Sequence, residues 1–114
     1  MNKPILNGFD TKEATLLTGK NIEAGMALTL ENSSKGKIPA ADEHFCCVCT
    51  VERGIYLTVV LRGHTSVKYS GTDPVIGYNK LAADGNGYVK VSDAGRLILV
   101  TDVDKVNKTI DIIL

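Results

Sequence analysis

The sequence predicts a small all-β fold, a single-domain β-barrel or sandwich, with an extended N-terminal arm. Val, Ile and Thr, which favour strands, are frequent along the whole chain. Gly, Asn and Asp interrupt these runs about every 8 to 12 positions, a spacing typical of all-β sandwiches and barrels. Several runs alternate apolar and polar residues, which puts the apolar side chains on one face of a half-buried strand. The 114 residues suffice for one domain with an ordinary core.

The first elements differ in how clearly the pattern defines them. The stretch Thr11–Thr18, "TKEATLLT", has the length of two helical turns, but its threonines and the glycine that follows favour a first strand equally. Met26–Glu31, "MALTLE", alternates apolar and polar residues and predicts a half-buried strand. Gly36–Ala40 is short, and Pro39 confines it to an edge or to a strand end.

The rest of the chain predicts a series of strands joined by tight turns. The strands are expected at His44–Glu52, Ile55–Tyr69, Val75–Asp84, Tyr88–Ser92, Arg96–Asp104 and Lys108–Leu114. Gly63 lies in the middle of the longest one and indicates a bulge or a bend where a strand passes from one side of a barrel to another. "DGNG" at Asp84–Gly87 predicts a hairpin turn. The last strand is expected to be paired and to close the sheet.

The first residues form a separate segment in this prediction, with an arm over 1–11 and a β domain over 12–114. Pro4 and Gly8 disfavour regular structure in the arm. Its other notable residues are apolar, and apolar residues on a mobile terminus often become ordered against a partner. The candidate partner-binding residues are Pro4, Ile5, Leu6 and Phe9.

Charge and hydropathy exclude several classes of function. The formal net charge is +0, with 13 basic and 13 acidic residues scattered along the chain. A general nucleic-acid binder needs an excess of Lys and Arg. No apolar run approaches the ~20 residues that cross a bilayer, and the N-terminus lacks the apolar core of a signal peptide. We therefore expect synthesis in a cytoplasm, and the odd number of cysteines also argues against a secreted disulfide framework.

The stretch "HFCCVC" holds every cysteine of the chain and is the most suggestive chemical feature. Strand alternation predicts two sets of side chains, with Phe45, Cys47 and Cys49 toward the core and His44, Cys46 and Val48 on the other face. Each face then offers at most two ligands, whereas a structural zinc site takes four. The sequence therefore predicts no metal site, and the cysteines are expected to be small buried hydrophobes.

The sequence around these cysteines lacks the features that activate a catalytic thiol. A redox C-x-x-C places its first cysteine at a helix N-terminus, and this stretch predicts a strand. A nucleophilic cysteine needs an adjacent base, and His44 is expected to face away from Cys47 and Cys49. We therefore predict no catalytic residue, no cofactor and no enzyme activity.

Three further features are expected to be structural rather than chemical. "DGNG" lacks the following helix and the G-K-[ST] ending of a phosphate loop. "DVDK" at Asp102–Lys105 lacks the further oxygen ligands of a calcium loop, so solvated strand and turn residues are expected there. The tyrosines are expected to pack on the sheet with their hydroxyls at its rim. They are Tyr56, Tyr69, Tyr78 and Tyr88.

The succession of strands and glycines resembles a known family over about residues 12–114. "IEAGMALTLENSSKGKIPAADEHFCCVCTV" puts a glycine before an alternating strand and ends in a strand led by phenylalanine. "RGIYLTVVLRGHTSVKYSG" adds a hairpin led by glycine and a long strand with a central glycine. "VIGYNKL" then precedes the "DGNG" turn. This order is similar to that of the capsid decoration proteins of tailed bacteriophages, also called capsid cement or head-stabilisation proteins.

The resemblance implies a structural role on a virion. Such proteins are small β-rich modules, here expected to be β-tulip-like, and they are not enzymes. They bind the outer surface of the assembled head, often as homo-trimers, and stabilise contacts between major capsid protein subunits. The resemblance thus implies the major capsid protein as partner, the capsid exterior as location and a shell contact through the N-terminal arm. It implies no nucleic-acid or membrane partner.

Two other functions stay open at this point. One is another virion β-barrel binding module, on a tail or base plate, that binds a carbohydrate or other ligand. Such a site needs exposed aromatic side chains beside polar groups, and the chain has 5% aromatic residues and no Trp. The other is a small enzyme or metalloprotein that uses the cysteines and His44, which elemental analysis for zinc would identify.

Overall fold

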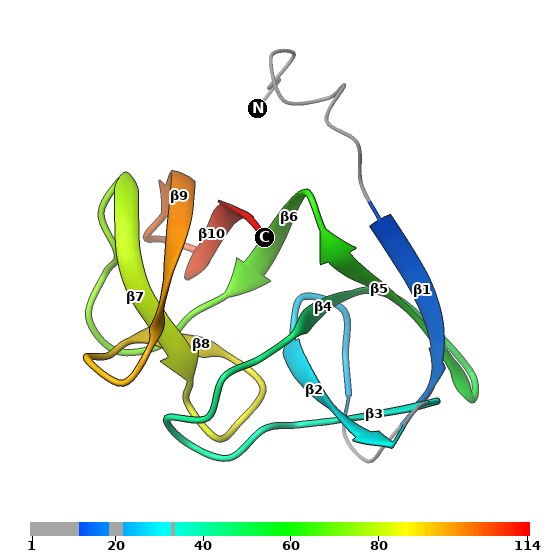
Figure 1. Ribbon diagram of the computed structural model, residues 1–114. Coiled ribbons are helices and arrows are strands. Elements are labelled where there is room, and N and C mark those ends of the chain that lie inside the picture. The colour runs from blue at the N-terminus through cyan, green and yellow to red at the C-terminus, as the bar shows by residue number, and fades with distance from the viewer. Residues whose placement is uncertain (1–11, 19–21, 33) are drawn as a thin grey trace.

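The computed structural model describes residues 12–18, 22–32 and 34–114. All the regular secondary structure in these residues is β-strand (Figure 1). The strands are β1 (Lys12–Leu17), β2 (Ala27–Asn32), β3 (Lys35–Lys37), β4 (Cys47–Arg53), β5 (Tyr56–Arg62), β6 (His64–Lys68), β7 (Gly77–Ala83), β8 (Val89–Val91), β9 (Arg96–Asp104) and β10 (Thr109–Ile113). The all-β prediction is confirmed. The predicted arm, with Pro4, Ile5, Leu6 and Phe9, lies outside the described residues. Within the described part, no helix capable of crossing a membrane occurs.

The first five strands form a closed barrel in the order β1-β3-β2-β4-β5. Strand β1 pairs antiparallel with β5 along its whole length, from Lys12 opposite Arg62 to Leu17 opposite Tyr56. A parallel contact between Leu17 and Lys35 of β3 closes the barrel. Tertiary pairing thus decides between helix and strand for Thr11–Thr18. Strand β5 pairs with β4 on one edge, and β1 supplies the hydrogen-bond partners on its other edge.

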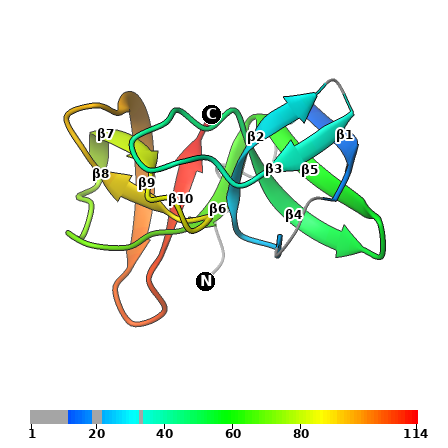
Figure 2. The same ribbon diagram turned by 90° about the horizontal axis from the view of Figure 1, so that it is seen from below.

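The other five strands form a second sheet in the order β6-β10-β9-β7-β8. The last strand of the chain, β10, lies inside this sheet and pairs with both β6 and β9. The sheet curves back on itself, since a parallel bridge joins Tyr69, just after β6, to Val89 of the opposite edge. Figure 2 shows the barrel and the second sheet side by side, with β6 at their junction.

The stretch Ile55–Tyr69, predicted as one strand with a central bend, is two strands that belong to different sheets. Gly63 separates β5 from β6 with a φ of 108°, a left-handed conformation that favours glycine. Its NH donates to the carbonyl of Leu114 and its carbonyl accepts from the Leu114 NH. The predicted bend at Gly63 is present, but the chain passes there from the barrel to the second sheet and not from one side of a barrel to another.

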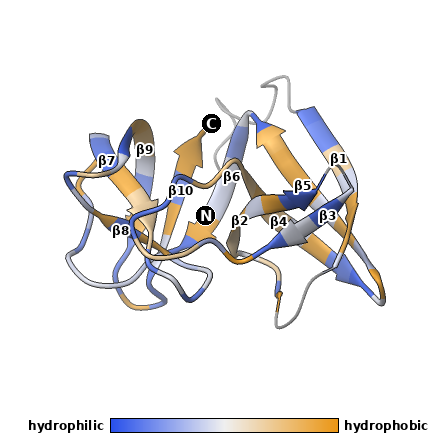
Figure 3. Ribbon diagram, turned by 60° about the horizontal axis from the view of Figure 1, so that its bottom comes forward, coloured by the Kyte–Doolittle hydropathy of each residue, from blue (hydrophilic) through white to orange (hydrophobic). Residues whose placement is uncertain are grey.

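Two apolar cores fill the two units, and β4 contributes to both. The barrel core consists of Leu16, Ile22, Met26, Leu28, Cys47, Cys49, Leu57 and Val59. The sheet core consists of Ala27, Phe45, Val48, Val67, Tyr69, Leu81, Val89, Ile98, Val100, Ile110 and Ile112. Each large side chain buried in this way contributes about 1.5–3 kcal/mol. In Figure 3, β5, β10 and the end of β7 are coloured largely as hydrophobic, in agreement with their place around these cores.

The connection from β8 to β9 crosses over β7. Both strands pair antiparallel with β7 on opposite sides, and both reach Leu81, where Val91 is the partner on one side and Arg96 on the other. The chain between them, from Ser92 to Gly95, therefore passes directly over the backbone of Leu81. The tight turn expected between the predicted strands Tyr88–Ser92 and Arg96–Asp104 is present, but its crossing of another strand was not predicted.

Candidate functional site

The stretch "HFCCVC" begins before β4 rather than inside it. Phe45, Cys47 and Cys49 are buried, whereas Cys46 and His44 are exposed, as the alternation predicted. The prediction that Phe45 shares a core with Cys47 and Cys49 is wrong, and the expectation that the cysteines are buried is wrong for Cys46. Val48 lies on the face opposite the two buried cysteines, as predicted, and is itself buried. The second sheet covers the outer face of β4, so Val48 and Phe45 pack in the sheet core while the two cysteines pack in the barrel core.

The thiols of Cys46 and Cys47 are closer than alternation implies. Because β4 starts only at Cys47, Cys46 is free of the strand geometry that separates neighbouring side chains, and the two Sγ atoms lie 3.8 Å apart. The hydrogen bond between the thiols, aided by Thr29, lowers the pKa of Cys46 to about 6. The same contact and burial raise the pKa of Cys47, and burial raises that of Cys49. Among the described residues, no three His, Cys, Asp or Glu side chains are placed to hold a metal ion.

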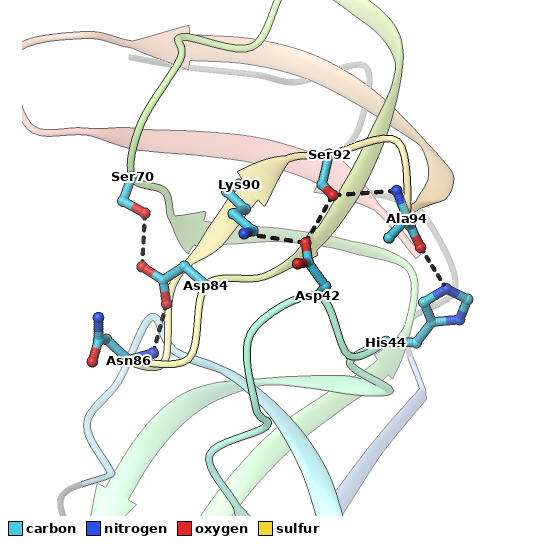
Figure 4. A network of polar contacts seen from close by, with 8 residues as sticks. All are labelled: Asp42, His44, Ser70, Asp84, Asn86, Lys90, Ser92 and Ala94. Atoms are coloured by element: carbon cyan, nitrogen blue, oxygen red, sulfur yellow. Dashed lines mark hydrogen bonds and ion pairs between the residues drawn. The ribbon is translucent and has the colours of Figure 1, made fainter.

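Polar contacts attach the loop between β3 and β4 to the second sheet (Figure 4). The Asp42 NH donates to the carbonyl of Ala83 at 2.8 Å. The Asp42 carboxylate accepts from the Ser92 hydroxyl at 2.9 Å and pairs with the Lys90 ammonium at 3.1 Å. The hydrogen bond from Ser92 and the contact with Lys90 lower the pKa of Asp42. This cluster holds the loop, and with it the start of β4, against the edge strand β8.

The same cluster contains the three residue types of a hydrolytic triad, Asp42, His44 and Ser92. In a triad the serine hydroxyl contacts the imidazole, and the imidazole contacts the carboxylate. Here the Ser92 hydroxyl donates directly to Asp42, and His44 Nε2 lies 3.1 Å from the carbonyl of Ala94. The arrangement connects loops and does not place a base on the serine.

The carboxylates in the motifs "DGNG" and "DVDK" accept hydrogen bonds from backbone NH groups of their own turns. Asp84 accepts from the Asn86 NH and from the Ser70 hydroxyl, each at 2.7 Å (Figure 4). It also accepts from the Tyr88 NH at 3.1 Å. This confirms the hairpin turn at "DGNG". Asp104 accepts from the NH groups of Val106 and Asn107, and its contacts with Asn107 lower its pKa. Both carboxylates are thus engaged in closing turns.

The tyrosines divide into two pairs. Tyr69 is buried and donates to Asp73 at 2.6 Å; its burial, together with this bond, raises its pKa to about 12. Tyr88 is half-buried against the barrel core. The prediction of packed tyrosines is therefore right for these two and wrong for Tyr56 and Tyr78, which are 52% and 70% exposed. The latter two lie on outward faces that no other described element covers.

Tyr78 belongs to a group of exposed apolar residues, which we call the β7–β9 patch. The patch consists of Val75, Ile76, Tyr78 and Leu97, which are 65%, 70%, 70% and 61% exposed. Leu97 is opposite Lys80 in the ladder, one diagonal step from Tyr78, a separation that long side chains span. Leu99, opposite Tyr78, and Ile113, opposite Leu99, continue the same face as half-buried residues. Contiguous exposed apolar surface of this kind marks interaction sites.

The tip of the patch is held in one conformation by Asn79. Its amide nitrogen donates to the carbonyls of Val75 and Gly77 at 2.7 and 3.0 Å, and its Oδ1 accepts from the Val75 NH at 3.1 Å. Gly77 has a φ of 114°, and the chain bends at Ile76, directly before β7 begins. Val75 and Ile76 are therefore presented on a fixed segment, which lowers the entropy that a partner must overcome on binding.

A second exposed apolar group, which we call the β4–β5 patch, consists of Leu17, Ile55 and Tyr56. Tyr56 is directly opposite Leu17 in the barrel, and the Thr18 NH donates to the carbonyl of Ile55 at 2.9 Å. Ile55 is 62% exposed. Figures 1 and 2 both place the turn between β4 and β5 at the end of the barrel that is remote from β7 and β9. The molecule thus carries apolar surface at two opposite ends.

A cavity of about 880 Å³ opens where the β7–β8 turn approaches the barrel. Its described lining is Thr18, Ile22, Glu23, Met26, Ile38, Glu52, Gly54, Gly85 and Asn86. Two carboxylates and no aromatic side chain are part of that lining. Ligand sites are usually rich in apolar and aromatic side chains, so the cavity adds little support for a carbohydrate-binding module.

Comparison with known proteins adds no family to this description, because no family model and no curated protein matches the chain. The two patches were also missed in the sequence. Val75–Asp84 was expected to be a single strand, in which alternation would expose only one of Val75 and Ile76. Gly77, two residues into that stretch, was the available signal that the strand starts later.

Proposed function

We propose that this protein is a capsid decoration protein of a tailed bacteriophage, which binds the outer surface of the assembled head and stabilises contacts between major capsid protein subunits. The observation that carries the proposal is the β7–β9 patch, four largely exposed apolar residues, two of which lie just before β7 on a segment that Asn79 holds by hydrogen bonds. Side chains fixed in this way favour binding to a preformed surface. The resemblance in the order of strands and glycines supports a capsid as that surface.

The polar contacts agree with a binding role. Asp42, Asp84, Asp104 and Ser92 are engaged in turns and in the attachment of loops. These contacts stabilise a compact β structure whose strands are paired around a closed barrel and a curved sheet. A module that must withstand strain in a shell benefits from such paired edges, because they resist opening.

The two patches support assembly as a homo-trimer on the head. A ring of identical subunits joined head to tail uses two different surfaces on each subunit. The β7–β9 patch and the β4–β5 patch are two such surfaces at opposite ends. In the proposed trimer at least part of each patch meets a neighbouring copy or the capsid subunit beneath it.

The proposal is tested by co-sedimentation of the purified protein with assembled heads that lack it. We expect saturable binding to heads, greater resistance of the decorated heads to heat or chelator, and no binding to unassembled capsid subunits. Absence of binding to the heads of the phage that encodes the protein would overturn the proposal. Saturable binding to tails alone would favour the alternative of a tail or base-plate module.

Deletion of residues 1–10 is expected to abolish head binding and to leave the β domain folded. The first described strand begins at Lys12, so the deletion removes none of the ladder contacts of β1. The apolar side chains of Pro4, Ile5, Leu6 and Phe9 are the proposed shell contact. Circular dichroism and thermal unfolding check the fold, and co-sedimentation checks binding. Full binding by the truncated protein would show that the arm makes no necessary contact.

A further inference from the structure

The three cysteines differ sharply in their surroundings although they lie within four consecutive positions. Cys46 is exposed, whereas Cys47 and Cys49 are fully buried in the barrel core. The Cys46 Sγ lies 3.8 Å from the Cys47 Sγ, while the Cys47 and Cys49 thiols contact the carbonyls of Leu28 and Val51. The chain therefore presents one accessible thiol in contact with one buried thiol, and the third is buried in the same core as the second.

The accessible thiol is also the reactive one. Three groups face the Cys46 sulfur and favour its thiolate, namely the thiol of Cys47, the side chain of Thr29 and the positive charge of Arg96. The contact with Cys47 is the largest influence and lowers the pKa of Cys46 to about 6. Thiolate is the nucleophilic form of cysteine. The contact with Cys46 and burial raise the pKa of Cys47, and burial raises that of Cys49, so both buried thiols favour the protonated form.

We propose that Cys46 and Cys47 form a redox-active pair, in which a hydroperoxide oxidises Cys46 and Cys47 then closes a disulfide. The Cys46 thiolate attacks one peroxide oxygen, the O–O bond breaks, and water or an alcohol leaves after protonation. The Cys47 sulfur then attacks the sulfur of the Cys46 sulfenic acid. The S–O bond breaks, the S–S bond forms, and water leaves with the proton of Cys47. Two thiols lose two electrons and the peroxide gains them.

The bond formed in this way is expected to be readily reduced. Adjacent residues keep their Cα atoms about 3.8 Å apart across a trans peptide, whereas disulfides usually join Cα atoms about 4.4–6.8 Å apart. A disulfide held outside its preferred geometry is strained and has a more oxidising potential. The pair is thus suited to reversible oxidation that protects Cys46 from irreversible sulfinic acid. This inference is independent of capsid binding.

The test is to treat the folded protein with hydrogen peroxide, denature it, label free thiols with a maleimide and measure intact mass. We expect the number of labelled cysteines to fall from three to one, with a mass loss of two hydrogen atoms before labelling. Peptide mapping is expected to place the bond between Cys46 and Cys47, and dithiothreitol to restore all three labels. A disulfide-linked dimer as the main product, or Cys46 sulfinic acid beside a free Cys47, would overturn the proposal.

Three variants distinguish the role of Cys46, the thiol that the peroxide oxidises, from the role of Cys47, the thiol that closes the disulfide. In Cys47→Ala, oxidation is expected to stop at the Cys46 sulfenic acid, which dimedone captures. In Cys46→Ser, the two remaining thiols are expected to stay reduced. Cys49→Ala is the matched control, because it removes a thiol from the same core and is expected to form the disulfide as the wild type does. Loss of the disulfide in Cys49→Ala, with the fold intact by circular dichroism, would contradict the assignment of Cys47.

Discussion

Replacement of Gly95 by alanine is expected to destabilise the protein by about 3 kcal/mol or more, the upper range for overpacking a rigid site. A Cβ atom at Gly95 would lie 2.5 Å from the carbonyl carbon of Leu81 and 2.6 Å from its nitrogen and oxygen. These are backbone atoms of β7, which is held between β8 and β9 and cannot yield as a side chain can. The chain crosses β7 at this point, and only a residue without a side chain fits the crossing.

Thermal or urea unfolding measures this effect. For a domain of this size, each kcal/mol corresponds to roughly 4–8 °C in the midpoint, so the loss is expected to be at least roughly 12 °C. Gly36→Ala is the matched control, since its Cβ would find side-chain neighbours at 3.5–3.7 Å, an ordinary contact distance. Gly36→Ala is expected to change stability by less than about 1 kcal/mol. Equal stability of the two variants would show that the crossing has room.

The fold could be predicted where local pattern and tertiary structure agree. Arg96–Asp104 is rich in apolar and β-branched residues and lies between two turns, and β9 has those bounds. The Gly63 bend was predictable because a glycine weakens the interior of a straight strand and is typical of a bulge or a sharp bend. The partition into a barrel and a second sheet was not, since it depends on which strands pair. The passage from β8 to β9 over β7 involves only four residues, too few to suggest a crossing in the sequence.

The candidate sites were less predictable than the fold, for a related reason. Alternation predicted correctly that Cys47 faces the core and that Cys46 does not, but it separated their sulfurs, because it assumed that the strand included both. The outward place of Ile76 depends on bonds that Asn79 makes back to Val75. The hydrogen bonds of Asn79 depend on the backbone conformation at Gly77, which the sequence does not specify. In a sequence, two adjacent apolar residues such as Val75 and Ile76 are more typical of a buried segment than of an exposed binding surface.

Replacement of both Tyr78 and Leu97 by threonine is expected to weaken head binding at least about 100-fold and to leave the fold intact. Central interface residues of this kind each contribute about 2 kcal/mol or more when truncated, and 1.4 kcal/mol corresponds to about tenfold in affinity. Both side chains are more than half exposed, so their loss removes little core packing. Threonine also keeps the strand propensity of these positions. Stability is expected to change by about 0.5 kcal/mol or less.

The decisive comparison is with Val106→Thr, which removes an apolar side chain that is 91% exposed in the turn between β9 and β10, outside both patches. If general surface hydrophobicity drove association with heads, the loss of Val106 would weaken binding in proportion. If the β7–β9 patch is the contact, Val106→Thr binds as the wild type does and only the double variant fails in co-sedimentation. Undiminished binding by the double variant would exclude Tyr78 and Leu97 from the interface and leave the arm and the β4–β5 patch as the remaining contacts.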